Sequence, residues 1–403
     1  MNSFLVEWGK DLKSIPVGPL AIIAMSGCED MGRKVNAWLQ KWNSFQETQD
    51  EEFFTNPGPN RDSFLIKTYC PRFGTGESKG VIKESVRGYD IYIIVDVCAY
   101  NKTYTMYGME VPMSPDDHFQ DLKRVIAAIG GKAKRINVIM PMLYESRQHK
   151  RSARESLDCA LALQELQQYG VANIITFDAH DPRVANAVPL IGFENVMPPY
   201  QMMKALCRTE KNLAIDKENM MVVSPDEGAM QRNIFYSAVL GLDLGMFYKR
   251  RDYTTVINGR NPIVAHEYLG ASVEGKDVIV VDDMIASGDS MIDLCKELKK
   301  RKANRIFAMA TFAFFTSGTE EFDKAYQDGY LTRVIATNLT YRRPEVQSAP
   351  WFAEADLSKY IAYIVATLNH DRSLSSLLNP YDKIKRLLAR YRADQAAEGI
   401  RLV

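Results

Sequence analysis

The residue types between Val278 and Ser290 could bind an anion. The segment is an apolar run that ends in two acids, followed by small residues and the start of a helical pattern. Small residues at a helix N-terminus present backbone N–H groups and the positive end of the helix dipole to an anion. The adjacent Asp282 and Asp283 could bind sugar hydroxyls or a magnesium ion, because both require oxygen partners. A simpler interpretation is a capped strand-to-helix turn with incidental acids.

Other charged side chains follow predicted strands elsewhere in the chain. Lys249, Arg250 and Arg251 form a basic cluster after an apolar strand, and His180 and Asp226 each follow a strand end. Ligands of open α/β sheets collect at the carboxyl ends of the strands. The cluster could therefore neutralise phosphates, and His180 and Asp226 could ligate a metal. A solvated loop and a structural histidine are the simpler interpretations.

Motifs along the chain resemble those of the ribose-phosphate diphosphokinases (phosphoribosyl diphosphate synthetases). Residues 278–290 resemble the ribose-phosphate loop that this family shares with type I phosphoribosyltransferases. The ordered set covers most of the chain from about residue 70 to 375. The other matching segments are Arg72–Glu77 with Ile82–Ile91, Tyr144–Lys150 with Ser152–Arg154, Thr176–His180, Ser224–Gly228 and Tyr248–Arg251.

The resemblance implies an ATP site. Phe73 and Arg147 would sandwich adenine, since stacking buries both flat faces of a purine, and Glu77 and Gln148 would hydrogen-bond to the base edge. A core role is the simpler interpretation of Phe73. The full ATP-binding set implied is Phe73, Glu77, Arg147, Gln148, Lys150 and Arg154.

The resemblance also implies the remaining site residues. Lys249 and Arg251 would be catalytic and stabilise the transferred group, and His180 and Asp226 would hold Mg²⁺ on the ATP phosphates. Ribose 5-phosphate would be bound by Asp282, Asp283, Ser287, Gly288, Asp289 and Ser290.

The implied reaction is transfer of the β,γ-diphosphoryl group of MgATP to the C1 hydroxyl of ribose 5-phosphate. It yields phosphoribosyl diphosphate, for nucleotide biosynthesis, and AMP. One alternative is a phosphoribosyltransferase, which would need a single domain of this kind. Another is a non-catalytic regulatory homologue, which the altered residues Ala286 and Asp289 would favour.

The chain departs from the family pattern at several positions. Thr75 stands where the family usually has Asp, so one adenine contact is changed. Ala286 lacks a carboxylate that would bind the sugar, and Asp289 lies in a phosphate cradle, where an acid is unfavourable unless its side chain turns outward. His149 replaces an acid in the ATP segment. Extra residues lie around 103–115.

Short apolar β-branched runs alternate with helical patterns, which indicates an α/β fold with buried, mainly parallel sheets. The pattern occurs twice, which predicts two similar phosphoribosyltransferase-like domains at 1–198 (ATP side) and 199–375 (ribose 5-phosphate side), with a helical extension at 376–403. The clearest predicted strands are 20–25, 91–97, 135–139, 174–177, 221–224, 244–248, 277–281 and 305–311. The clearest predicted helices are 31–42, 156–169, 231–240, 290–300 and 382–395.

Composition limits the class of protein. The 403 residues carry 50 Lys and Arg against 50 Asp and Glu, so net charge gives no reason to expect a nucleic-acid or membrane partner. We expect no signal peptide and no membrane-spanning run, and six scattered cysteines without CxxC spacing argue against zinc and disulfides. We expect a cytoplasmic protein. The resemblance implies a homo-oligomer built from dimers, with a hexamer as one arrangement.

Overall fold

The computed structural model describes residues 15–47, 62–251 and 263–397, without the side chains of 44–47, 249–251 and 263–266. The chain divides into two compact units. Unit 1 comprises residues up to 197 together with 339–341 and 357–379, and unit 2 comprises 198–338, 342–356 and the residues from 380 onward.

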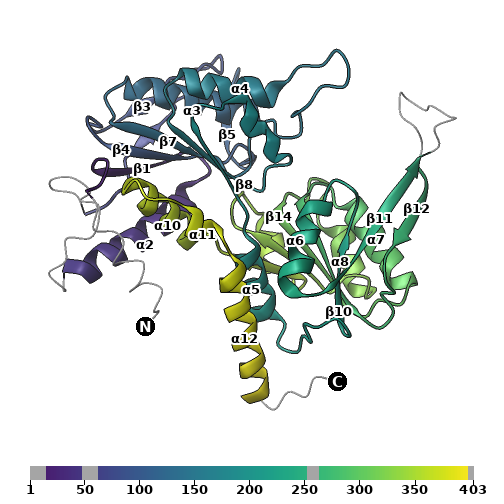
Figure 1. Ribbon diagram of the computed structural model, residues 1–403. Helices are drawn as coiled ribbons and strands as arrows, with labels where there is room; N and C mark the ends of the chain where they lie inside the picture. The colour runs from purple at the N-terminus through teal and green to yellow at the C-terminus, as the bar shows by residue number, and fades with distance from the viewer. Residues whose placement is uncertain (1–14, 48–61, 252–262, 398–403) are drawn as a thin grey trace. The chain divides into compact units, whose positions relative to one another are not determined.

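Unit 1 is built on a five-stranded, wholly parallel sheet in the order β1-β4-β7-β8-β9. Helices cover both faces of this sheet: α3 and α4 lie on one side, and α2 and α10 on the other (Figure 1). Its inner strands are therefore largely buried and mostly apolar. The strands are β1 Leu20–Ala24, β4 Asp90–Ile94, β7 Arg135–Ile139, β8 Asn173–Phe177 and β9 Gly192–Val196. Two small hairpins pair β2 Thr68–Tyr69 with β3 Val81–Ile82, and β5 Thr103–Met106 with β6 Met109–Pro112.

The helices of unit 1 come from both ends of the chain. They are α2 Glu29–Glu47, α3 Pro115–Ile129, α4 Asp158–Gln168, the 3₁₀ turn η1 Pro182–Ala187, α10 Ser358–Asn369 and α11 Ser375–Leu378. Residues 357–375 were expected in the C-terminal domain, but they belong to unit 1. The reason is packing: Trp42 of α2 stacks on Tyr363 with ring centroids 4.5 Å apart, and the Asn369 side-chain amide donates to Asp90 Oδ2 at 2.9 Å.

Unit 2 is built on a seven-stranded sheet in the order β12-β11-β10-β13-β14-β15-β16. All neighbouring strands are parallel except β11 and β12. The strands are β10 Met220–Ser224, β11 Asp243–Arg251, β12 Ile263–Leu269, β13 Asp277–Ile285, β14 Ile306–Ala313, β15 Arg333–Thr337 and β16 Phe352–Ala355. The helices are α5 Pro199–Thr209, α6 Met230–Leu240, α7 Asp289–Lys300, α8 Glu320–Gln327, α9 Pro344–Ser348 and α12 Tyr381–Ala397.

The predicted fold class of two α/β domains with mainly parallel sheets is confirmed. The segment 376–403, predicted as a separate helical extension, forms α12 from 381 to 397, which packs on α5 and α6 of unit 2. All six cysteines are free. Among the described residues, no helix is both long and apolar enough to cross a membrane.

Candidate active site

A loop with a left-handed glycine joins β13 to α7. Gly288 has φ 101°, a conformation that favours glycine, and a Cβ there would overlap the ring of Phe322. The α7 helix begins at Asp289, so backbone N–H groups of its first turn are without helical partners. A helix N-terminus with unpartnered N–H groups thus follows the buried strand β13, an arrangement that suits an anion.

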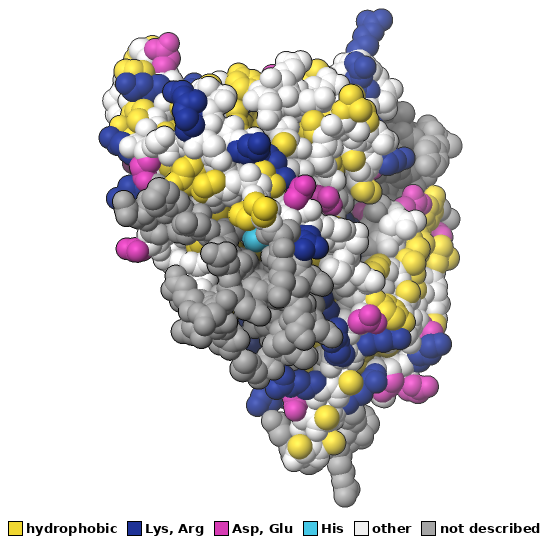
Figure 2. Space-filling view, turned by 60° about the vertical axis from the view of Figure 1, so that its left-hand side comes forward, with side chains coloured by type: hydrophobic (Ala, Val, Ile, Leu, Met, Phe, Trp, Pro, Cys, Tyr) yellow, Lys and Arg dark blue, Asp and Glu magenta, His cyan; other side chains and the backbone are white. Residues whose placement is uncertain are grey.

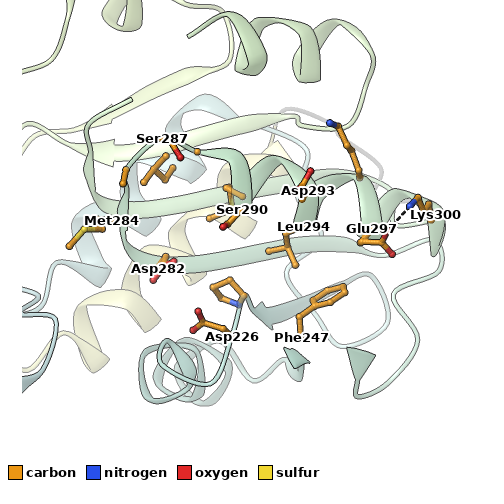
Figure 3. Close-up of a pocket in the computed structure, with 16 residues that line it drawn as sticks. Asp226, Phe247, Asp282, Met284, Ser287, Ser290, Asp293, Leu294, Glu297 and Lys300 are labelled. Carbon is orange, nitrogen blue, oxygen red and sulfur yellow. Dashed lines mark hydrogen bonds and ion pairs between the residues drawn. The ribbon is translucent and has the colours of Figure 1, made fainter. Parts of the chain in front are cut away.

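A pocket of about 490 Å³ lies beside this loop in unit 2. Four of the six predicted ribose 5-phosphate residues line it: Asp282, Ser287, Gly288 and Ser290. In Figure 3, Asp226 and Asp282 lie at the end of the pocket opposite Glu297 and Lys300. The remaining lining residues are Pro225, Phe247, Met284, Ile285, Ala286, Met291, Asp293, Leu294 and Lys296.

Asp283 and Asp289, also predicted for this site, lie outside that lining. Asp283 is the next residue of β13; it is buried, and its Oδ1 accepts from the backbone N–H of Met284 at 2.8 Å. Asp289 is exposed and accepts the Ser287 hydroxyl at 3.1 Å. The acid that the sequence makes unfavourable in a phosphate cradle is thus not part of the pocket lining.

The electrostatics of the pocket centre on Asp282. Burial and the neighbouring Asp283 carboxylate raise the pKa of Asp282, while Arg232, whose Nη1 lies 3.9 Å from Oδ1, opposes the shift. A bound group that donates hydrogen bonds to Asp282 would favour its ionised form. The arrangement therefore suits a ligand with hydroxyl donors, such as a sugar diol.

Asp226 lies at the adjacent strand end. It follows β10, the neighbour of β13, and its Oδ1 accepts the Ala229 backbone N–H at 3.1 Å just before α6 begins. The Ser224 hydroxyl donates to the Asp226 carbonyl at 2.8 Å and fixes the same turn. Two neighbouring parallel strands thus bring the carboxylates of Asp226 and Asp282 into one pocket.

In unit 1, residues 73–77 form a tight turn, here called the Phe73–Glu77 turn. The Phe73 N–H donates to the Glu77 carbonyl at 2.7 Å, and the Gly76 N–H donates to the Phe73 carbonyl at 2.9 Å. The Phe73 ring is 53% exposed, which excludes the core role. The Thr75 hydroxyl donates to Glu77 Oε2 at 3.0 Å. The turn thus presents an aromatic face beside a carboxylate.

The predicted ATP segment is a loop between β7 and α4. Arg147, Lys150 and Arg154 are exposed on it, available to an anionic ligand. The Gln148 side-chain amide, however, donates to the backbone carbonyls of Lys150 at 3.4 Å and Ser156 at 2.8 Å. In this arrangement Gln148 stabilises the loop, while its predicted role at the base edge stays a prediction.

His180 is exposed just after β8 and has an imidazole neighbour that sequence reasoning did not foresee. The rings of His149 and His180 have centroids 5.3 Å apart, and His149 Nε2 lies 3.5 Å from Asp181 Oδ2. The Arg183 side chain, which pairs with Asp181, lowers the pKa of that carboxyl to about 2. The replacement of an acid by His149 was the only signal in the sequence.

Two predicted sets of residues stay predictions. The backbone of Lys249 and Arg251 continues strand β11, but their side chains are not among those that the structure describes. His180 belongs to unit 1 and Asp226 to unit 2, so their joint metal site stays a prediction. Within the residues that the structure describes, no three His, Cys, Asp or Glu side chains are grouped to hold a metal by themselves.

The pocket also contains residues that sequence reasoning missed. Asp293 and Lys296 extend its lining along α7, one turn beyond Ser290, and Phe247 contributes from β11. The helical spacing of Ser290, Asp293 and Glu297 was a usable signal, because residues three and four apart share one face of a helix.

Two family models match the chain in succession. A model for the N-terminal domain of ribose phosphate pyrophosphokinase matches residues 20–170, and a phosphoribosyl transferase domain model matches residues 203–339. The chain belongs to the ribose-phosphate pyrophosphokinase family. The first match also separates the chain from single-domain phosphoribosyltransferases.

Relatives of this family are similar along most of their length. The ribose-phosphate pyrophosphokinase of Vibrio cholerae is 29% identical over 312 residues, which cover 76% of this chain and 90% of that protein. The enzyme of the same name from Helicobacter hepaticus is 28% identical over 321 residues, 78% of this chain and 92% of that protein. The crystal structure of phosphoribosylpyrophosphate synthetase from Mycobacterium smegmatis superposes with a TM-score of 0.67 at 19% identity, covering 88% of this chain and 99% of that one, which confirms the fold.

Proposed function

We propose that this ribose-phosphate pyrophosphokinase family member transfers the β,γ-diphosphoryl group of MgATP to the C1 hydroxyl of ribose 5-phosphate. The products are phosphoribosyl diphosphate and AMP. The observation that carries the proposal is the unit 2 pocket, where Asp282 faces the same space as the amino end of α7. A sugar phosphate requires this combination of a hydrogen-bond acceptor and an anion-binding site.

Binding of ribose 5-phosphate follows from the pocket chemistry. Backbone N–H groups and hydroxyls of Ser287, Gly288 and Ser290 bind the 5-phosphate at the α7 N-terminus. The Asp282 carboxylate accepts hydrogen bonds from ring hydroxyls, and Asp283 and Asp289 support the loop through Met284 and Ser287. Fixing the sugar holds its C1 hydroxyl for in-line attack on the β-phosphorus, where most of the catalysis is positioning.

Asp226 fits a magnesium ion because its oxygen faces the pocket at a strand end. Magnesium is commonly held by one or two carboxylates together with substrate phosphates, which agrees with the lack of a self-sufficient metal cluster among the described residues. Asp226 would hold the ion together with His180. When bound, Mg²⁺ neutralises charge on the triphosphate.

The ATP side of the proposal uses unit 1 and the basic end of β11. Phe73 stacks on the base, Glu77 accepts from its edge, and Arg147 covers the other face. Lys150 and Arg154 neutralise phosphates. Lys249 and Arg251 stabilise the diphosphoryl group during transfer. The nucleotide site is completed across a subunit contact, so the active protein is a homo-oligomer built from dimers.

The regulatory alternative loses its main support. It rested on Ala286 and Asp289, and the Asp289 carboxylate is outside the pocket lining. Ala286 leaves Asp282 as the acid that faces the sugar. No observation favours a second function.

Phosphorus NMR of purified protein with ribose 5-phosphate, ATP and magnesium tests the proposal. We expect AMP together with a diphosphate ester at the sugar C1. Lys249→Ala should lower turnover by roughly 100-fold or more, with little change in ribose 5-phosphate affinity. Such a loss also shows that the activity does not come from a contaminating enzyme. Lys324→Ala, an exposed charge on α8, is the matched control. ADP formation without AMP, or no turnover at any phosphate concentration, would contradict the proposal.

A further inference from the structure

A two-residue hairpin loop in unit 1 carries an exposed tyrosine. Strands β5 and β6 pair with Met106 opposite Met109, so Tyr107 and Gly108 form the whole loop. Both have positive φ, 51° and 77°, which defines a type I′ turn. The Tyr107 side chain is 73% exposed.

Neither folding nor the turn explains this tyrosine. A type I′ turn favours Asn, Asp or Gly at its first central position, and an aromatic residue with left-handed backbone is strained there. An exposed ring also gains little from burial on folding. Strained residues that the fold does not require are candidates for function.

The hairpin is fixed against the Phe73–Glu77 turn. The Tyr107 N–H donates to the Gly74 carbonyl at 2.8 Å, which places Tyr107 beside Phe73. The absence of a Cβ at Gly76 lets the Met106 sulfur approach to 2.7 Å from the position that a Cβ would take. These contacts hold the hairpin tip and the turn together as one surface.

Neighbouring side chains orient the base of the hairpin. The Arg72 guanidinium lies 4.6 Å from the Tyr104 ring centroid and pairs with Asp121 at 2.9 Å. Arg72 immediately precedes Phe73, so the strand that ends at Met106 and the turn share this buried anchor. The position of Tyr107 is therefore determined by ordered contacts on both sides of the tip.

We propose that Tyr107 is a nucleobase-binding residue whose ring contacts the purine of the bound nucleotide beside Phe73. The inference rests on the proposed function and adds a specificity-determining residue to its ATP site. Phe73 stacks on the base face and Tyr107 extends the aromatic surface beside it, while Thr75 and Glu77 meet the base edge through their hydroxyl and carboxylate. A second aromatic residue strengthens purine binding where Thr75 replaces the acid.

Binding measurements without ribose 5-phosphate test this inference apart from turnover. The decisive variant is Tyr107→Asn, because Asn suits the turn and removes only the ring. We expect its melting temperature to equal or exceed that of the wild type, while the Kd for MgATP rises roughly tenfold. The Kd for magnesium tripolyphosphate, which has no base, should not change. Tyr107→Phe should retain wild-type affinity, and Met109→Ala, 59% exposed on the same hairpin, is the matched control.

The outcomes separate this inference from the proposed function. Unchanged MgATP affinity in Tyr107→Asn, with normal wild-type turnover, overturns the inference and leaves the function standing. An equal loss of ATP and tripolyphosphate affinity, accompanied by dissociation of the oligomer in light scattering, assigns Tyr107 to a subunit contact and also overturns it. If Tyr107→Asn loses affinity for MgATP but not for magnesium tripolyphosphate, and the wild type makes no AMP, the result supports the inference and contradicts the proposed function.

Discussion

Gly288 is the position at which a single methyl group should most affect the proposed sugar-phosphate site. Gly288→Ala adds a Cβ that overlaps Phe322 and imposes a left-handed backbone on alanine. We expect a loss of about 1–3 kcal/mol in stability and an increase of roughly tenfold or more in the KM for ribose 5-phosphate, because the loop moves. Calorimetry and steady-state kinetics measure the two effects.

Gly275→Ala is the matched control for that variant. Gly275 also has positive φ, 74°, but no heavy atom lies within 4 Å of the position that a Cβ would take there. It should therefore lose stability without any change in KM. Equal KM values for wild type and Gly288→Ala would contradict the assigned role of the loop.

Asp282 should give stability a specific pH dependence. The pKa of Asp282 is raised in the folded protein, so the folded state favours the protonated carboxyl. The free energy of unfolding is therefore highest below the ordinary carboxyl pKa of about 3.9. It decreases as the pH rises through the pKa of Asp282 in the folded protein. Asp282→Asn removes this loss. Urea unfolding should show that the free energy of unfolding of the variant rises relative to that of the wild type between pH 5 and pH 9. The turnover of the variant falls. A constant difference between the two proteins over that range would exclude the effect.

Elements with strong local patterns were predictable, and those fixed by distant contacts were not. The strand at 135–139 has the predicted bounds, and Arg135 is its first residue, because β-branched apolar residues make up three of the four positions that follow. The β5–β6 hairpin was missed since Tyr107–Gly108 lacks the Asn-Gly or Asp-Gly signal of such turns. The short β16 contains Glu354 and depends on pairing with β15.

The candidate site, too, could be predicted from the sequence only in part. The motif predicted the loop between β13 and α7, but not which side chains face the pocket. Asp282 lines the pocket and Asp283 does not, because residues alternate between the two faces of a strand, and a one-residue shift in the register of β13 would exchange them. The side chain of Asp289 turns outward through its contact with Ser287, which spacing alone does not determine.

Helix α12 should contribute directly to the stability of unit 2. It buries Ile384, Leu388 and Tyr391, and the Tyr391 hydroxyl donates to the Glu210 carbonyl. Leu388→Ala should cost about 2–5 kcal/mol, measured by urea unfolding. Arg390→Ala, on the exposed side of the same helix, should change stability by at most about 0.5 kcal/mol. Equal effects would mean that α12 does not dock through this face.

At the scale of the whole molecule, acidic and basic side chains are intermixed. Figure 2 shows Lys and Arg side chains spread among acidic and hydrophobic ones on this face, without one large basic patch. The equal numbers of acids and bases agree with that distribution. In the proposed function, binding of phosphorylated substrates would therefore depend on local features, such as the α7 N-terminus and the loop that carries Arg147.

The division into units predicts which fragments fold. A fragment of residues 1–197 lacks α10 and so exposes Trp42, and it leaves Asp90 without the Asn369 amide. We expect it to be insoluble or uncooperative in thermal unfolding. Joining residues 357–379 to it through a flexible linker should restore a sharp transition in circular dichroism. A cooperative 1–197 fragment would show that α10 is dispensable.

The late position of α10 in the sequence has a consequence for synthesis on the ribosome. Unit 1 lacks its covering helix α10 until residue 369 has been translated, roughly 170 residues after residue 197. At bacterial or eukaryotic elongation rates the delay is about 10–40 s. During this interval the apolar face around Trp42 is uncovered, so the nascent chain becomes a natural client for chaperones that shield exposed hydrophobic surface.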